Sequence, residues 1–276
     1  MLAPNLALRV PVTRDIPLLP LRKRVSYSKA VTVCIAAKFL WHANQRMFLL
    51  CADSRMSGGY ALDDHADKLF RLGRNCMAMI AGNDPAGAFR ICRNWRKRIL
   101  ASDKEWSFDV LVDCIRAGMD EYIASPLSGD SAELDFIVTG FCGDDLILLH
   151  AFIYSKQPRL VEYPFSTAIG SGAHAALAML NHRQYTASVK RERAIYAIYE
   201  AKKFSEHADG VGANTQIMIH GPFSGGDKDT TCGIYLSDAA LQHLEGLRQG
   251  LFIPPKIPGI EKFPDDYFQG DYPFSN

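Results

Sequence analysis

The feature that most constrains this sequence is a pair of short apolar runs near its start, which a polar loop joins. The first run, 32–39, reads Thr-Val-Cys-Ile-Ala-Ala-Lys-Phe, and the second, 47–52, reads Met-Phe-Leu-Leu-Cys-Ala. Apolar, β-branched runs of this length around a polar loop predict a β-hairpin. The hairpin would place Thr32 at the start of one strand and Asp53 at the end of its neighbour. We therefore expect the Thr32 hydroxyl and the Asp53 carboxylate to lie close together.

This placement has a chemical meaning if the chain is cut before Thr32. The threonine hydroxyl and the newly formed α-amine would then belong to one residue, and an N-terminal amine is an established activator of a threonine nucleophile. Residues 1–31 contain four prolines, six basic residues and one acid, and they lack the uninterrupted apolar core of a signal peptide. We interpret 1–31 as a leader or propeptide-like arm. If this arm is removed before Thr32, the full chain is a zymogen.

The rest of the chain predicts one body, 32–250, followed by a tail at 251–276 that is rich in proline and aromatic residues. Within the body we expect strands and helices in alternating groups. The predicted strands are 32–39, 47–52, 68–72, 76–81, 135–141, 146–154, 215–219 and 231–236, and the predicted helices are 85–100, 107–125, 173–181 and 188–208. Helices grouped between antiparallel strand pairs indicate an α+β fold of two packed antiparallel sheets flanked by helix layers.

Composition narrows the functional classes. The 31 basic residues nearly balance the 30 acidic ones, which disfavours nucleic acid and anionic membranes as main partners. No apolar run is long enough to span a bilayer. The seven cysteines are scattered without a CxxC pair, which favours free buried thiols in a reducing cytoplasm over a disulfide framework or a metal site. The sequence suggests no cofactor.

Four segments, in this order, resemble the proteasome β-type subunits and the peptidase of the bacterial heat-shock ATP-dependent protease. They are the run from Thr32, the Cys-Ala-Asp-Ser-Arg segment at 51–55, the Asp-Lys-Leu and Met-Ile-Ala-Gly segments at 67–69 and 79–82, and the Ala-Ile-Gly-Ser-Gly-Ala segment at 168–173. The resemblance extends over about 32–219. It implies the four-layer αββα sandwich of the N-terminal-nucleophile (Ntn) hydrolases and a threonine endopeptidase that hydrolyses peptide bonds.

The resemblance also implies roles for single residues. Thr32 would be the nucleophile, with its freed amine as the base, and Asp53 and Lys68 would tune each other beside it. The N–H of Gly82 would stabilise the oxyanion. Two further residues, Ser171 and Asp209, would orient the amine and its proton path.

Specificity and assembly are implied in the same way. Ile80 would line the pocket for the substrate residue before the cut, which suggests a preference for apolar side chains. The implied partners are polypeptide substrates, further copies of the chain in a homo-oligomeric ring, and an ATP-dependent unfoldase.

Two other functions stay open. Val31 stands where self-cleaving β-type subunits usually carry glycine, and Gly212 stands where a second supporting serine is expected. These departures favour, as an alternative, a non-catalytic ring or scaffold subunit that remains unprocessed. An amidase of the same fold that acts on a small amide is a third reading.

Overall fold

The computed structural model describes residues 32–42, 45–54, 56–58, 61–63, 68–73, 75–102, 106–126, 132–222, 232–250 and 268–269. The predicted leader, Val31, and almost all of the predicted tail lie outside these residues. The side chains of 56–58, 61–63, 232 and 268–269 are also outside the description.

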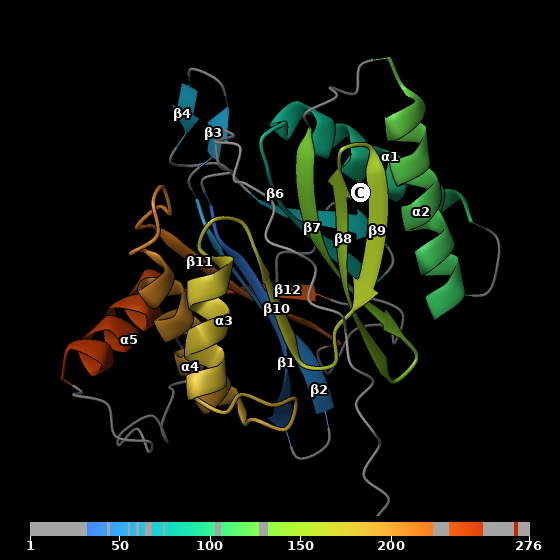
Figure 1. The fold of residues 1–276 in the computed structure, drawn as a ribbon. Coiled ribbons are helices and arrows are strands. Elements are labelled where there is room, and N and C mark those ends of the chain that lie inside the picture. The colour runs from blue at the N-terminus through green and yellow to red at the C-terminus, as the bar shows by residue number, and fades with distance from the viewer. Residues whose placement is uncertain are drawn as a thin grey trace, which may run out of the picture.

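Two antiparallel sheets form the centre of the molecule (Figure 1). The first has the order β10-β1-β2-β11-β12-β13 and the second the order β5-β6-β7-β8-β9. The strands of the first sheet are β1 (Cys34–His42), β2 (Gln45–Asp53), β10 (Ser166–Ile169), β11 (Thr215–Gly221), β12 (Cys232–Leu236) and β13 (Phe268–Gln269). Those of the second are β5 (Leu69–Gly73), β6 (Cys76–Gly82), β7 (Glu133–Cys142), β8 (Asp145–Tyr154) and β9 (Gln157–Glu162).

Helices cover the outer face of each sheet (Figure 1). The second sheet packs against α1 (Pro85–Ala101) and α2 (Phe108–Ala124), and the first packs against α3 (Ala173–His182), α4 (Arg191–Ser205) and α5 (Asp238–Gly250). The start of α1 follows from its sequence, because the Asp84 side chain accepts a hydrogen bond from the Gly87 N–H at 2.9 Å and Pro85 occupies the first turn. These layers confirm the predicted αββα sandwich.

Three apolar clusters hold the layers together. One lies between the first sheet and α3–α5, a second between the other sheet and α1–α2, and a third between the two sheets. Strand β2 contributes to two of them, because its side chains alternate between the faces of the sheet. Leu49 belongs to the helix-facing cluster of the first sheet, and Leu50 belongs to the cluster between the sheets. We call this third cluster the inter-sheet core.

The structure also contains elements that the sequence did not predict. Strands β9 and β10 and helix α5 are additional, and a small hairpin of β3 (Met56–Gly58) and β4 (Ala61–Asp63) forms in a stretch for which we predicted no strand. Strand β13 pairs with β12, so one short part of the predicted tail is a sheet edge. Among the described residues, no helix is both long and apolar enough to cross a bilayer.

The predicted first hairpin is confirmed. Strands β1 and β2 pair antiparallel from Cys34 opposite Ala52 to the turn, and β11 lies on the other side of β2 with Thr215 opposite Asp53. This register brings Thr32, two residues before β1, and Asp53, the last residue of β2, to one end of the first sheet.

Candidate functional site

Three side chains from the two sheets meet at this end of the molecule. The Thr32 hydroxyl donates to Asp53 Oδ1 at 2.6 Å, and Lys68 Nζ donates to the same oxygen at 2.7 Å and also contacts the Thr32 hydroxyl. Thr32 precedes β1 and Asp53 ends β2, both in the first sheet, whereas Lys68 directly precedes β5 in the second. The group therefore spans the two sheets.

Burial makes this group chemically unusual. Thr32 is 4% exposed, Asp53 is fully buried and Lys68 is 1% exposed. A charge removed from water is costly unless a partner and hydrogen bonds compensate for the lost hydration. Here the carboxylate and the ammonium compensate each other, and the threonine hydroxyl lies in contact with both. The arrangement holds a hydroxyl oxygen beside a positive charge in a low-dielectric setting.

Two backbone N–H groups complete the environment of the carboxylate. Val33 N–H donates to Asp53 Oδ1 at 2.9 Å, and Gly212 N–H donates to Asp53 Oδ2 at 2.8 Å. In return, the Asp53 N–H donates to the Val33 carbonyl at 3.1 Å. Both carboxylate oxygens are thus held by donors that cannot rotate away, which fixes the direction in which Asp53 faces Thr32.

The turn before α3 holds the backbone of Thr32. Its N–H donates to Ser171 Oγ at 3.2 Å, and its carbonyl accepts from Ser171 Oγ at 3.2 Å and from the Gly172 N–H at 3.2 Å. Gly170 has a φ of +89°, and a Cβ built on it would lie 2.4 Å from the Thr32 carbonyl oxygen. Glycine is required at this position because of both the backbone conformation and the close approach.

Asp209 and Gly82 are positioned differently from the residues above. Ser171 Oγ lies 3.3 Å from the backbone carbonyl of Asp209, while the Asp209 residue itself is exposed, so the link to Thr32 uses its main chain. Gly82 ends β6 with a φ of +145°, and a Cβ there would lie 2.4 Å from the Glu133 carbonyl. The backbone conformation and the lack of space for a Cβ therefore explain the glycine at this position without reference to catalysis.

The side chain of Ile80 does not line an open site. It is 3% exposed and belongs to the cluster that faces α1 and α2. Its carbonyl accepts a hydrogen bond from Cys34 Sγ at 3.4 Å. Burial raises the pKa of the Cys34 thiol to about 12, with the nearby Lys68 ammonium opposing that rise. Cys34 is therefore a protonated core residue rather than a second nucleophile.

Two residues that the sequence did not predict for the site also belong to this network. Gly212 appeared as a position without the expected hydroxyl, yet its N–H binds Asp53. Lys202 is fully buried in α4, and its Nζ donates to the Gly212 and Ala213 carbonyls at 2.7 and 3.0 Å. The sequence did contain an indication that Lys202 is buried, because this residue follows Ile195 and Ile198 at helical spacing on the buried face of α4.

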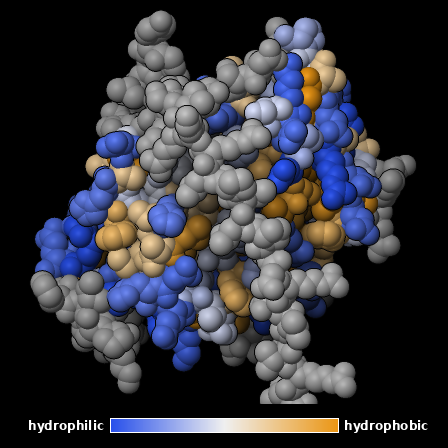
Figure 2. All heavy atoms as spheres, viewed as in Figure 1, coloured by the Kyte–Doolittle hydropathy of each residue, from blue (hydrophilic) through white to orange (hydrophobic). Residues whose placement is uncertain are grey.

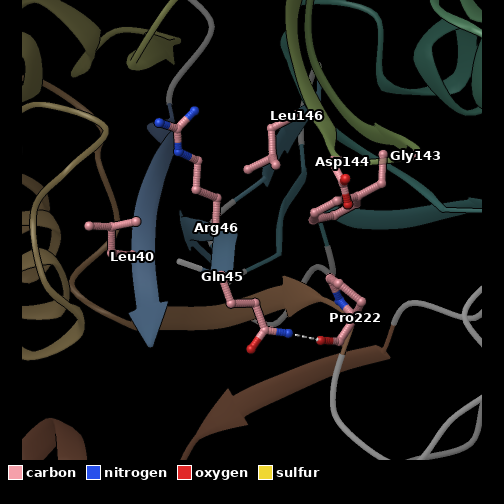
Figure 3. Close-up of a pocket in the computed structure, with 8 residues that line it drawn as sticks. Leu40, Gln45, Arg46, Gly143, Asp144, Leu146 and Pro222 are labelled. Carbon is pink, nitrogen blue, oxygen red and sulfur yellow. Dashed lines mark hydrogen bonds between the residues drawn. The ribbon is translucent and has the colours of Figure 1, made fainter. Parts of the chain in front are cut away.

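A pocket of about 560 Å³ lies elsewhere, at the opposite end of the β1–β2 hairpin (Figure 3). Its lining residues are Leu40, Gln45, Arg46, Phe141, Gly143, Asp144, Leu146 and Pro222. In Figure 3 the Gln45 side chain points to the Pro222 carbonyl, to which its amide donates. None of the predicted site residues lines this pocket. The described residues contain no group of three or more His, Cys, Asp or Glu side chains that could hold a metal ion.

Comparison with known proteins supports the fold and goes no further. A scan against protein-family models found no match, and neither did a search of curated proteins. The structure is similar to that of Anbu (ancestral beta-subunit) from Yersinia bercovieri, with a TM-score of 0.62 over 81% of this chain and 98% of that one, at 16% sequence identity. Similarity at this identity shows a shared proteasome-like fold.

These findings correct the family assignment that we made from the sequence. Membership of the proteasome β-type and heat-shock peptidase families is wrong as a conclusion, because no family model or curated protein matches and the structural similarity is to Anbu at low identity. The sequence motifs gave the fold correctly, since short motifs at turns and strand ends report the backbone arrangement they require.

Proposed function

We propose that this chain is an N-terminal-nucleophile hydrolase in which Thr32 cleaves peptide bonds after the leader 1–31 has been removed. One observation carries the proposal: the Thr32 hydroxyl contacts both Lys68 Nζ and Asp53 Oδ1 in a buried group. A strand-start threonine with no chemical role would not need a buried lysine and a buried carboxylate brought from two different sheets.

Each group has a defined task in the proposed reaction. Thr32 Oγ attacks the carbonyl carbon of the substrate, and its proton moves to the free Thr32 amine and then to the leaving nitrogen. Such an amine has an ordinary pKa of about 7.7–8.0, so it is a competent base near neutral pH. Lys68 Nζ stabilises negative charge that develops on Oγ, and Asp53 Oδ1, at 2.7 Å from Nζ, holds it in place beside Thr32. Water then hydrolyses the ester that links Thr32 to the acyl part of the substrate.

The other predicted residues take supporting roles in this proposal. Ser171 lies 3.2 Å from the Thr32 nitrogen, so its hydroxyl would orient the amine. The Asp209 carbonyl in turn orients the Ser171 hydroxyl. We assign the Gly82 N–H to the oxyanion, where losing one donor typically costs about 2.7–4 kcal/mol of transition-state stabilisation. Ile80 acts on specificity only through the backbone that it anchors.

The proposal requires removal of the leader, because in the full chain the Thr32 nitrogen is an amide and cannot accept a proton. Intact mass and N-terminal sequencing of the protein isolated from its native cell test this step. We expect a mature chain that begins at Thr32 and hydrolyses a panel of fluorogenic peptides. A chain that keeps Met1 and hydrolyses none of them contradicts the proposal.

A matched pair of variants tests the nucleophile. Thr32→Ala removes the hydroxyl, and we expect no peptide hydrolysis above background. Thr186→Ala removes a hydroxyl whose recorded partner is the exposed Ser188 Oγ at 3.0 Å, and we expect unchanged hydrolysis. Equal activity of Thr32→Ala and the unmutated protein would show that another group performs the chemistry.

A second candidate function is a non-catalytic subunit that keeps its leader. The observation that favours it is Val31, since a β-branched residue restricts the backbone turn that self-cleavage would need. This candidate predicts that Thr32→Ala leaves the cellular role intact, so complementation of a deletion strain by Thr32→Ala distinguishes it from the hydrolase.

We also propose that the chain assembles with copies of itself. The name of the similar protein, ancestral beta-subunit, describes a part of an assembly. Figure 2 shows hydrophobic side chains gathered over α3 and near β8 and β9, next to hydrophilic ones. Val161 and Phe165 in the β9–β10 region are 41% and 46% exposed, which is high for large apolar residues. Light scattering after size-exclusion chromatography should give a mass that is a multiple of 30.7 kDa for the uncut chain.

An ATP-dependent unfoldase as a further partner, and a cytoplasmic location, are parts of the same proposal.

A further inference from the structure

A second buried lysine contacts the main-chain segment that supports Asp53 in the proposed site. Lys202 in α4 is fully buried, and three acceptors surround its Nζ: a Glu206 carboxylate oxygen, the Gly212 carbonyl at 2.7 Å and the Ala213 carbonyl at 3.0 Å. An ammonium has three protons to donate, so these three acceptors satisfy it completely. Such an arrangement fixes the position of the acceptors as firmly as that of the lysine.

The acceptors belong to the segment that supports Asp53. Gly212 uses both of its main-chain polar groups: its carbonyl accepts from Lys202, and its N–H donates to Asp53 Oδ2 at 2.8 Å. The path therefore runs from α4 to the 212–213 backbone, then to Asp53, and from there to Lys68 and the Thr32 hydroxyl. Gly212 has no side chain that could hold the segment, so Lys202 supplies the anchor from outside.

We propose that Lys202 is a positioning residue, which holds the 212–213 backbone so that the Gly212 N–H stays directed at Asp53 and keeps the carboxylate aligned with Thr32 and Lys68. The catalytic part of this inference depends on the proposed hydrolase function, whereas the geometric part does not. Burial lowers the pKa of Lys202, and the Glu206 carboxylate opposes that change.

The neighbouring lysine provides a matched control. Lys203 contacts the same Glu206 oxygen at 3.0 Å and the Ala213 carbonyl at 3.4 Å, but its recorded contacts do not include Gly212. Its side chain is 19% exposed, so water can replace its contacts. Replacing either lysine by methionine removes one charge from the same turn of α4, and only Lys202→Met removes the anchor of Gly212.

The first readout is the Gly212 amide proton in NMR spectra of the full-length chain. A hydrogen bond to a carboxylate moves an amide proton downfield. The difference between the Gly212 signals of the unmutated protein and of Asp53→Asn gives the size of that shift. We expect Lys202→Met to move the Gly212 signal upfield and to speed its hydrogen exchange at least tenfold. Lys203→Met should leave the shift and the exchange rate within twofold of the unmutated protein.

The second readout is kinetic and uses the mature chain. We expect Lys202→Met to lower kcat at least tenfold with KM within twofold, because a displaced Asp53 affects the reaction more than substrate binding. If the unmutated chain hydrolyses no peptide, the proposed function fails and the NMR signature alone decides the role of Lys202. If peptides are hydrolysed and Lys202→Met leaves kcat and the Gly212 signal unchanged, the inference is overturned while the proposed function stands.

Should Lys202→Met fail to fold, Lys202→Gln provides the second measurement, because its amide can still donate to one carbonyl. We expect a Gly212 signal between those of the unmutated protein and Asp53→Asn. A folded Lys202→Gln with the unmutated Gly212 signal overturns the inference, as does a Lys203→Met variant that moves this signal equally.

Discussion

At the scale of single residues, removing one partner of the buried Lys68–Asp53 ion pair should destabilise the fold by an amount that depends on which partner is removed. Without Lys68, the Asp53 carboxylate keeps the N–H donors of Val33 and Gly212. Without the Asp53 charge, the recorded contacts of Lys68 Nζ reduce to the Thr32 hydroxyl. We therefore expect Asp53→Asn to lower the free energy of unfolding by about 3–5 kcal/mol. Lys68→Met should lower it by less. Urea unfolding of both variants gives the comparison.

A surface pair is the control for this measurement. Arg98 and Glu121 lie 2.8 Å apart with side chains 41% and 53% exposed, and exposed pairs of this kind contribute about 0–1 kcal/mol. Arg98→Met should shift the unfolding midpoint only slightly. A Lys68→Met variant that is less stable than Asp53→Asn would contradict our account of how the site is compensated.

A second residue-scale prediction concerns pH. His220 lies buried against the rings of Phe48 and Phe141, and burial lowers its pKa from 6.5 to about 3, with Arg71 adding to the effect. The stabilising contribution of the neutral ring is full above pH 6.5. As the pH falls from 6.5 towards about 3, the unfolded chain binds a proton that the folded chain does not, so the free energy of unfolding decreases.

The His220→Phe variant tests this sign. The decrease from one such group approaches about 1.4 kcal/mol per pH unit. Unfolding curves between pH 7 and 4 should therefore fall less steeply for His220→Phe than for the unmutated protein. The control, Phe108→Leu, changes an exposed side chain that carries no titratable group and should keep the original slope. Parallel slopes for all three proteins would show that His220 does not titrate as its burial requires.

The predicted site residues whose side chains the structure brings together are those that stand at or beside strand ends. Thr32, Asp53 and Lys68 stand at strand ends, where a hairpin and a following strand bring them together. Ile80 is different, because β6 is buried on both faces and alternation cannot tell which face packs against the helices. Gly212 acts through its N–H, and a backbone donor has no signature in the residue type.

At the scale of secondary structure elements, the turn from β6 into α1 depends on one glycine. The φ of Gly82 is +145°, and an added Cβ would lie 2.4 Å from the Glu133 carbonyl of the adjacent strand. Backbone strain of this kind costs about 1–3 kcal/mol, and the contact adds to it because the obstructing atom is main chain. We expect Gly82→Ala to lower the thermal unfolding midpoint by several degrees, measured by circular dichroism.

A glycine in α5 gives the opposite expectation. Nothing lies within 4 Å of a Cβ added at Gly246, and alanine is more favourable than glycine inside a helix by about 0.8–1.0 kcal/mol. Gly246→Ala should therefore raise the midpoint. If both substitutions shift the midpoint in the same direction, the local geometry assigned to one of these glycines is wrong.

The elements that the sequence did not predict have in common that their apolar residues are few or irregularly spaced. Strand β9 is an edge strand whose side chains are mostly exposed and which contains Pro158, so it lacks the alternation of a half-buried strand. Helix α5 buries fully only Ala240 and Leu244, a narrow apolar stripe next to the Pro-rich tail. Strong elements such as β2 and α2 were predicted because their apolar residues are numerous and regularly spaced.

At the scale of the whole molecule, the inter-sheet core sets the distance between the two halves of the proposed site. Thr32 and Asp53 come with the first sheet and Lys68 with the second, so their contact depends on how the sheets pack. Local sequence patterns predicted the two sheets, but the packing of one on the other arises from long-range contacts that no single segment contains. The four-layer arrangement was predictable only because segment order and family motifs agreed.

Two adjacent leucines on β2 allow this dependence to be measured. Leu49 and Leu50 are both fully buried on the same strand, but Leu50 faces the inter-sheet core and Leu49 faces the helix layer of the first sheet. Replacing either by alanine leaves a cavity and costs about 2–5 kcal/mol of stability. Only the cavity at Leu50 lets the two sheets shift relative to each other. We expect Leu50→Ala to lower kcat for peptide hydrolysis at least tenfold and Leu49→Ala to lower it less than twofold, at comparable losses of stability in urea. An equal loss of kcat in both variants would mean that the site follows overall stability rather than the packing of one sheet on the other.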